Sequence, residues 1–172
     1  MKKPRKKSVS KAFLIFIGEA LPRWCDVERR PTKKYFLPFG ERRRLHERAL
    51  RAQAKDQLEV CGVMSADARG RIRLQFLANN SPKSLHFVLR ERDIRAARKD
   101  AHLSGYDVIG LFHSHPVSSA IPTRTDLRSF RANTVNLIYD VCGREPRLWR
   151  VAKKRGRTVA LQVPLILGRR GA

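Results

Sequence analysis

The chain has 172 residues, of which 42% are hydrophobic, and this is the size and composition of one globular domain. Lysine and arginine number 38 against 15 acidic residues, so the formal net charge is +23. The apolar content excludes a disordered chain, and the charge favours an anionic partner without identifying it.

The first 40 residues are expected to form a basic N-terminal arm. Several prolines lie among many lysines and arginines there, which disfavours regular structure. The apolar run Ala12–Ile17 is the stretch that can add one strand. It is short for a signal peptide, Glu19 follows it closely, and no small-x-small cleavage site is evident. No other segment approaches the length of a membrane span, so no membrane partner is expected.

A globular domain is predicted at residues 41–165, followed by a basic C-terminal tail at 166–172. The domain begins with residues 41–58, which contain neither glycine nor proline and are rich in good helix formers. Leu45 and Ala49 lie there at helical spacing. This segment is therefore predicted to be an amphipathic helix with a strongly basic outer face.

The rest of the domain alternates between short apolar runs and helical patterns. The predicted elements are strands at 59–64 and 72–79, a helix at 90–103, a strand at 106–115, a helix at 126–133, and strands at 135–141, 147–152 and 158–166. Turn-forming residues around Gly70 separate the first two strands, and Gly105 ends the second helix. This order predicts an α/β or α+β fold with a curved central mixed sheet flanked by helices.

The stretch FHSHPVSSAIPTRTDL contains His113 and His115, two positions apart at the end of a predicted strand. Alternation along a strand places both imidazoles on one face. Pro116 ends the strand, and the loop after it can return Asp126 to the histidines as a third ligand. Two histidines and one carboxylate, with a fourth position left for water, are typical of catalytic zinc. Zinc lowers the pKa of a bound water to near neutrality.

Hydrolysis at such a site also needs a base that takes a proton from water and passes it to the leaving amine. Glu59 is the best candidate, because it lies where the predicted helix meets the next strand and because the small Gly62 permits close approach. The alternative is a carboxylate at a helix end with no chemical role.

GLFHSHP, the seven residues from Pro116 to Pro122, TRTD and the upstream LEVCG resemble the JAMM, or MPN-plus, metallopeptidases. The pattern of that family is an upstream glutamate and then H-x-H, seven residues, and S-x-x-D. The resemblance covers roughly residues 41–151. It implies the JAB/MPN fold, which is similar to that of cytidine deaminases.

The resemblance also implies a role for each matching residue. His113, His115 and Asp126 are the expected zinc ligands, and Glu59 is the expected general base and acid. The family's serine, which stabilises the oxyanion, is replaced by Thr123. Threonine keeps the hydroxyl donor and adds a methyl that restricts χ1, so we expect the contact and the activity to be retained. The alternatives are a helix cap for Thr123 and a first-turn acid for Asp126.

The activity that the resemblance implies is zinc-dependent cleavage after the C-terminal glycine of a ubiquitin-like protein, by an isopeptidase or precursor protease. The motif looks most like that of bacterial stand-alone JAB peptidases. Many of those are encoded beside E1-like and E2-like proteins, including the proteins of antiphage conjugation operons. Residues 127–134 leave no room for the long second insertion of chain-specific eukaryotic deubiquitinases.

Two other functions stay open at this point. One is a JAB hydrolase that releases a small product such as cysteine from a sulfur-carrier protein. The other is a non-catalytic MPN scaffold or a nucleic-acid-associated JAB-like protein. The net charge likewise has two interpretations, an acidic ubiquitin-like partner or conjugating enzyme docked on the helix at 41–55, or nucleic acid bound by the arm and by residues 144–157.

The cysteines bear on location. Cys25, Cys61 and Cys142 are an odd number without a C-x-x-C pair, which indicates neither a disulfide framework nor a four-thiolate zinc site. The protein is therefore expected in the cytoplasm. Cys61 is expected to be a small buried residue rather than a nucleophile.

Overall fold

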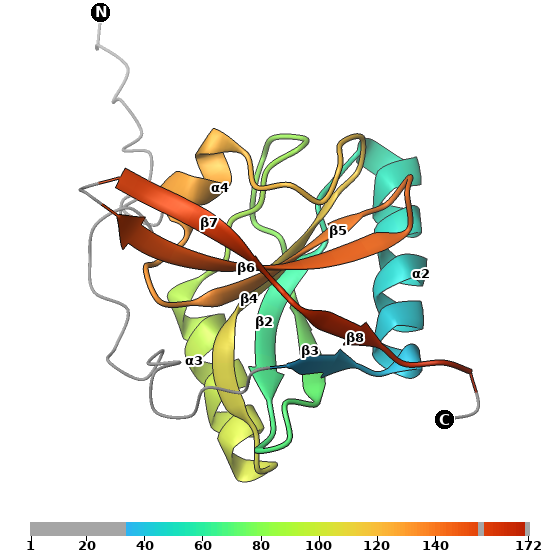
Figure 1. The fold of residues 1–172 in the computed structure, drawn as a ribbon. Coiled ribbons are helices and arrows are strands. Elements are labelled where there is room, and N and C mark those ends of the chain that lie inside the picture. Colours follow the sequence, from blue (N-terminus) through green and yellow to red (C-terminus); the bar gives the residue numbers. More distant parts are fainter. Residues whose placement is uncertain (1–33, 155–156, 171–172) are drawn as a thin grey trace, which may run out of the picture.

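The computed structural model describes residues 34–154 and 157–170, which form a mixed sheet flanked by helices (Figure 1). In chain order the elements are β1 (Tyr35–Leu37), α2 (Phe39–Asp56), β2 (Cys61–Ala66), β3 (Ile72–Leu77), α3 (Glu91–Leu103), β4 (Asp107–His115), α4 (Arg124–Ser129), β5 (Val135–Asp140), β6 (Glu145–Lys154), β7 (Arg157–Val163) and β8 (Leu165–Leu167). The main sheet has six strands in the order β3-β2-β4-β5-β6-β7, and β1 and β8 form a separate pair. Only β4 and β5 are parallel neighbours in the main sheet as described. The predicted fold class is confirmed.

The helices α2 and α3 cover opposite faces of the sheet (Figure 1). On one face, Leu45 and Ala49 of α2 pack in a core cluster with Phe112 of β4. On the other face, Ile94 and Ala97 of α3 pack against β2. Because both faces are covered, every residue of β2 is buried. None of the helices within the described ranges is both long enough and apolar enough to cross a membrane.

The β1–β8 pair joins the two ends of the described chain. The two strands are parallel, and the N–H of Gly168 donates to the carbonyl of Leu37 at 2.9 Å. Tyr35 and Leu37 are only 1% and 0% exposed and belong to the core on the α2 face. Residues expected in the arm at 1–40 and in the tail at 166–172 therefore take part in folded structure. Residues 1–33, including the run considered as a strand, lie outside the described part of the chain.

Several predicted elements differ in their bounds from those observed, among them one strand and two helices. The strand predicted at 158–166 is two strands, β7 and β8, separated by Pro164, which has no N–H for a sheet hydrogen bond. The first helix ends at Asp56, because Gln57 adopts a left-handed conformation with φ 51°. The helix predicted at 126–133 is α4, which begins earlier and ends at Ser129.

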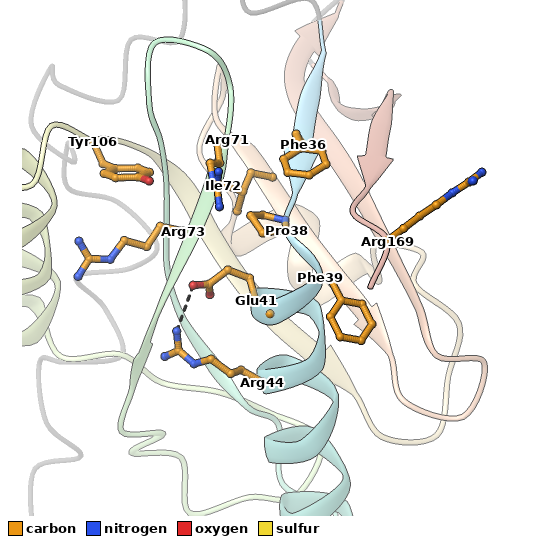
Figure 2. Close-up of a pocket in the computed structure, with 11 residues that line it drawn as sticks. Phe36, Pro38, Phe39, Glu41, Arg44, Arg71, Ile72, Arg73, Tyr106 and Arg169 are labelled. Atoms are coloured by element: carbon orange, nitrogen blue, oxygen red, sulfur yellow. Dashed lines mark hydrogen bonds and ion pairs between the residues drawn. The ribbon is translucent and has the colours of Figure 1, made fainter. Parts of the chain in front are cut away.

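Glu41 fastens the start of α2 to β3. One carboxylate oxygen accepts the backbone N–H of Leu74 at 3.2 Å, and the other accepts from Arg44 at 3.1 Å (Figure 2). A hollow surrounds this contact, and arginines and aromatic rings from several elements line it: Phe36, Phe39, Arg44, Arg71, Arg73, Tyr106 and Arg169. None of the residues predicted as metal ligands lines this hollow.

Candidate metal centre

His113 and His115 lie at the C-terminal end of β4, in the middle of the sheet between β2 and β5. Their side chains are 0% and 3% exposed. The Nε2 atoms of the two rings are 3.0 Å apart, so the strand presents both imidazoles on one face as its alternation predicts. Two ring nitrogens this close require a proton or a cation between their lone pairs.

Asp126 completes the cluster from the first turn of α4. Its Oδ1 is 3.2 Å from Nε2 of His113, and its Oδ2 is 3.4 Å from Nε2 of His115. The ligand atoms that the three residues offer all lie within 4.8 Å of one another. The structure therefore brings together the three residues that the motif predicts as ligands.

The charges in this cluster stabilise one another. Burial raises the pKa of Asp126, but hydrogen bonds from His113, His115 and Thr123 outweigh burial and hold that pKa well below its usual range. Burial lowers the pKa of His115. Its hydrogen bonds to Asp126 and to the carbonyl of Ser119 raise that pKa by more than burial lowers it, so the net direction is upward. The carboxylate is thus ionised and attracts a positive charge at this position.

The hydrogen bond of His115 determines which of its nitrogens faces the cluster. Nδ1 lies 2.7 Å from the carbonyl oxygen of Ser119, which can only accept, so Nδ1 carries the proton there. Nε2 is then the nitrogen that faces Asp126 and His113, as in histidines that bind a metal through one ring nitrogen and donate from the other. Within the described residues the cluster holds two imidazole nitrogens, one carboxylate and no fourth ligand, and this donor set fits zinc with an open position.

Thr123 is the N-cap of α4. Its Oγ1 accepts the backbone N–H of Asp126 at 3.1 Å, and Oδ2 of Asp126 accepts both the N–H and the hydroxyl of Thr123 at 2.7 Å. This reciprocal arrangement is a capping box. The capping alternative for Thr123 is thus observed, and the capping box also orients the carboxylate of Asp126. The oxyanion contact of Thr123 stays a prediction.

Glu59 lies just before β2 and is 8% exposed. Burial raises the pKa of its carboxyl, His113 and His115 lower it, and Asp126 raises it again, with a net upward direction. These interactions place the carboxyl in the electrostatic field of all three predicted ligands. A carboxyl with a raised pKa suits a group that must both accept and return a proton.

Gly62 has a different role from the one expected. A Cβ at this position would lie 2.0 Å from the carbonyl oxygen of Gln75 and 2.7 Å from the ring of Phe112. The missing side chain is therefore needed for the close packing of β3 and β4 against β2. The three atoms nearest to such a Cβ belong to Gln75 and Phe112, not to Glu59.

Ser114 is a site residue that the sequence analysis did not identify. It lies on β4 between the two histidines, is fully buried, and its Oγ accepts the N–H of Val60 at 2.9 Å. Its own N–H donates to the carbonyl of Val60 at 2.8 Å. Ser114 thus anchors the residue next to Glu59. A buried serine inside an apolar strand was the sequence signal for this contact.

Phe87 forms a wall of the cluster and was also missed. Its ring is stacked on His113 with centroids 4.8 Å apart and an interplanar angle of 25°. Phe130 lies against His113 in a tilted arrangement at 5.8 Å. Phe87 comes from the long segment between β3 and α3, where a single aromatic residue has no periodic neighbours to signal its role. Both rings limit the access of water to His113.

Cys61 does not take part in this chemistry. Its thiol is buried, and burial raises its pKa to about 12. It is therefore a neutral thiol in the core on the α3 face, as expected.

Comparison with known proteins gives three further findings. Residues 42–152 match the family described as prokaryotic homologs of the JAB domain. A desampylase of Pyrococcus furiosus is 22% identical over 107 residues, covering 62% of this chain and 68% of the relative. A desampylase of Haloferax volcanii is 27% identical over 93 residues, covering 52% of this chain and 66% of the relative.

Solved structures show the same fold. A protein of Desulfitobacterium hafniense, solved in solution, is 25% identical, with a TM-score of 0.59, and the match covers 79% of this chain and 94% of that one. The match covers far more of the chain than the short stretch that carries the two histidines and the aspartate, so the likeness is one of fold.

Proposed function

The chain belongs to the family of prokaryotic JAB-domain proteins, and we propose that it is a zinc-dependent hydrolase that cleaves after the C-terminal glycine of a ubiquitin-like protein. One observation carries this proposal. The buried cluster of His113, His115 and Asp126 interacts electrostatically with a fourth buried residue outside it, Glu59, whose carboxyl group has a raised pKa.

Zinc is the metal that this donor set suits best. His113 and His115 would hold it through Nε2 and Asp126 through its carboxylate. When bound, zinc supplies a Lewis acid that acidifies water and polarises the carbonyl that is attacked.

The chain's own groups then handle protons and orientation. Glu59 takes a proton from the attacking water and passes it to the nitrogen of the leaving group, so that the C–N bond breaks and an amine and a carboxylate form. Thr123 holds Asp126 in place through the capping box. Phe87 and Phe130 shield His113, which strengthens the interactions inside the cluster.

The substrate class follows from the resemblance of the motif and from the relatives. Both curated relatives are named desampylases, and the chain spans about two thirds of the length of each. We propose that the substrate is a conjugate or precursor of a ubiquitin-like protein in the cytoplasm of a bacterium. E1-like and E2-like proteins are the proposed partners, in a conjugation system of the antiphage kind. The complete ligand set favours this enzyme over a non-catalytic scaffold.

Two measurements together test the proposal. Elemental analysis of the purified protein gives its metal content, and cleavage of a ubiquitin-like fusion ending in Gly-Gly is followed with and without a chelator. We expect about one zinc per chain, as in single-ion catalytic sites, and cleavage that the chelator stops and added zinc restores. Asp126→Ala should lose both metal and cleavage. Full zinc retention in Asp126→Ala would remove Asp126 from the ligand set, and a metal-free wild-type protein would refute the proposal.

A further inference from the structure

Asn79 sits where β3 runs into the loop that precedes α3, and its side-chain amide makes four hydrogen bonds. Nδ2 donates to the carbonyl of Glu59 and to the carbonyl of His86, both at 2.9 Å. Oδ1 accepts the N–H of Ser81 at 2.9 Å and the N–H of Val88 at 3.1 Å. One amide therefore joins the entry to β2 to both ends of this loop.

The bonds also determine the orientation of the amide. Each hydrogen of the NH₂ group points at a carbonyl, and each bond to the oxygen comes from an N–H. A flipped amide would place oxygen against two carbonyls and NH₂ against two N–H donors. Asparagine is thus the side chain that satisfies all four groups, and an aspartate cannot replace it.

Both groups held by Asn79 belong to the candidate site. The carbonyl on one side is that of Glu59, the candidate base. The bonds on the other side bracket Phe87, since His86 and Val88 are its neighbours in the chain. The ring of Phe87 is stacked on His113. The same amide therefore sets the relative positions of the base and of the wall beside the first histidine.

We propose that Asn79 is a positioning residue for the hydrolytic site, which holds the backbone of Glu59 and the Phe87 wall in register with His113. This inference rests on the proposed function. Loss of the Nδ2 donor releases the loop from Glu59, so that the base and the wall no longer share one support. A displacement of about 1 Å in a catalytic group is enough to lower a rate by roughly a hundredfold.

The main variant is Asn79→Asp, which keeps the size and one acceptor oxygen but turns the donor into an oxygen facing two carbonyls. Asn79→Ala removes the amide without this repulsion and serves if the aspartate variant does not fold. Asn80→Asp is the matched control. The amide of Asn80 also donates to carbonyls of this segment, those of Ala78 at 2.9 Å and Val88 at 3.4 Å, but not to Glu59.

The first readout does not depend on activity. In the metal-free protein, the ring protons of His113 experience the ring current of Phe87 and are shifted in the NMR spectrum, and Phe87→Leu gives the unshifted reference. We expect Asn79→Asp and Asn79→Ala to move these signals toward the Phe87→Leu positions and Asn80→Asp to leave them near wild type. Unmoved signals in folded Asn79 variants, or an equal movement in Asn80→Asp, would overturn the proposal.

The second readout is turnover of the Gly-Gly fusion. We expect Asn79→Asp to lower kcat by roughly 10- to 100-fold, with a smaller change in KM and unchanged zinc content. An unchanged kcat with displaced ring signals would show that the contact is structural only and would also overturn the proposal. If wild-type protein cleaves no such fusion, the proposed function fails, and the NMR comparison alone decides whether Asn79 positions Phe87 against His113.

Discussion

At the scale of single residues, the carboxyl of Glu59 is the group on which the proposed chemistry depends. It is buried beside three residues that offer metal ligands, yet it is not a member of their cluster. Its chemical role and metal binding can therefore be separated by experiment.

Glu59→Gln is expected to retain zinc and to lose turnover. Glutamine keeps the size of the side chain but does not transfer the proton, and general acid–base catalysis is worth about 10²- to 10⁴-fold. Metal content and single-turnover cleavage are measured on the same preparation. Glu47→Gln is the control, because Glu47 is an exposed residue of α2 that pairs with Arg43 at the surface. Turnover within a few-fold of wild type in Glu59→Gln would rule out Glu59 as the base.

Two roles of the Thr123 hydroxyl can also be separated by experiment, the orientation of the ligand Asp126 and the stabilisation of an oxyanion. Thr123→Ser keeps both hydroxyl bonds to Asp126 and should leave stability and zinc affinity unchanged. Thr123→Val removes them, and the loss of a cap lowers the free energy of unfolding by about 0.5–2 kcal/mol. Because Oδ2 of Asp126 also loses a donor, zinc affinity should fall in the same variant.

Denaturant unfolding and competition with a chelator measure these two effects of Thr123→Val. Equal zinc affinity in the valine and serine variants would show that the capping box does not orient the ligand. A drop in kcat at saturating zinc would instead indicate that the hydroxyl also contacts the oxyanion.

At the scale of elements, the metal cluster was predictable and the supports around it were not. Residues two apart on a strand share a face, so the pairing of His113 with His115 follows from local geometry. The stack of Phe87 on His113 and the contacts of Asn79 depend on how a loop folds back over the sheet. Such contacts have no periodicity, and their partners are distant in sequence.

The β1–β8 pair was unpredictable for a related reason. The predicted arm and tail were assigned from their proline content and charge, which are properties of local sequence. The parallel pairing joins Tyr35 to Leu165, and nothing in either short segment specifies the other. By contrast, α2 and α3 were predicted to within a few residues, because a helical pattern repeats over several turns.

The packing of β2 against its neighbours gives a prediction at this scale. Gly62→Ala should lower the melting temperature strongly or prevent folding, because the new Cβ would lie 2.0 Å from the backbone carbonyl of Gln75. The carbonyl of Gln75 cannot move out of this contact without disturbing the pairing and packing of β3 against β2. The control is Gly40→Ala in the first turn of α2, where a Cβ meets nothing within 4 Å. Thermal unfolding followed by circular dichroism compares the two, and equal melting temperatures would contradict the packing argument.

At the scale of the whole molecule, the formal net charge is +23, and the residues of the candidate metal centre do not account for it. Arginines from separate elements gather around the hollow at the start of α2, where Glu41 is the single acidic residue of the lining (Figure 2). The outer face of α2 adds further exposed arginines, among them Arg43 and Arg51. A surface of this kind attracts an acidic partner and raises its rate of encounter.

If an acidic ubiquitin-like protein docks on α2, added salt should weaken the binding of this substrate and leave the rate of the chemical step unchanged. We expect kcat/KM for an acidic fusion to fall as salt rises from about 50 to 200 mM, a range over which the Debye length shortens below about 10 Å, while cleavage of a short neutral Gly-Gly peptide stays constant. The double variant Arg43→Glu, Arg51→Glu should raise KM for the fusion and leave kcat unchanged.

The matched control for that variant is Arg95→Glu, Lys99→Glu on α3, which makes the same change in net charge on the opposite face of the sheet. Charge in general would affect both variants alike, whereas docking on α2 affects only the first. Equal effects, or a kcat/KM that does not respond to salt, would contradict docking on α2. Strong inhibition by a DNA oligonucleotide in wild type but not in the α2 variant would instead assign that surface to nucleic acid, because phosphate contacts account for most of the salt dependence of such binding.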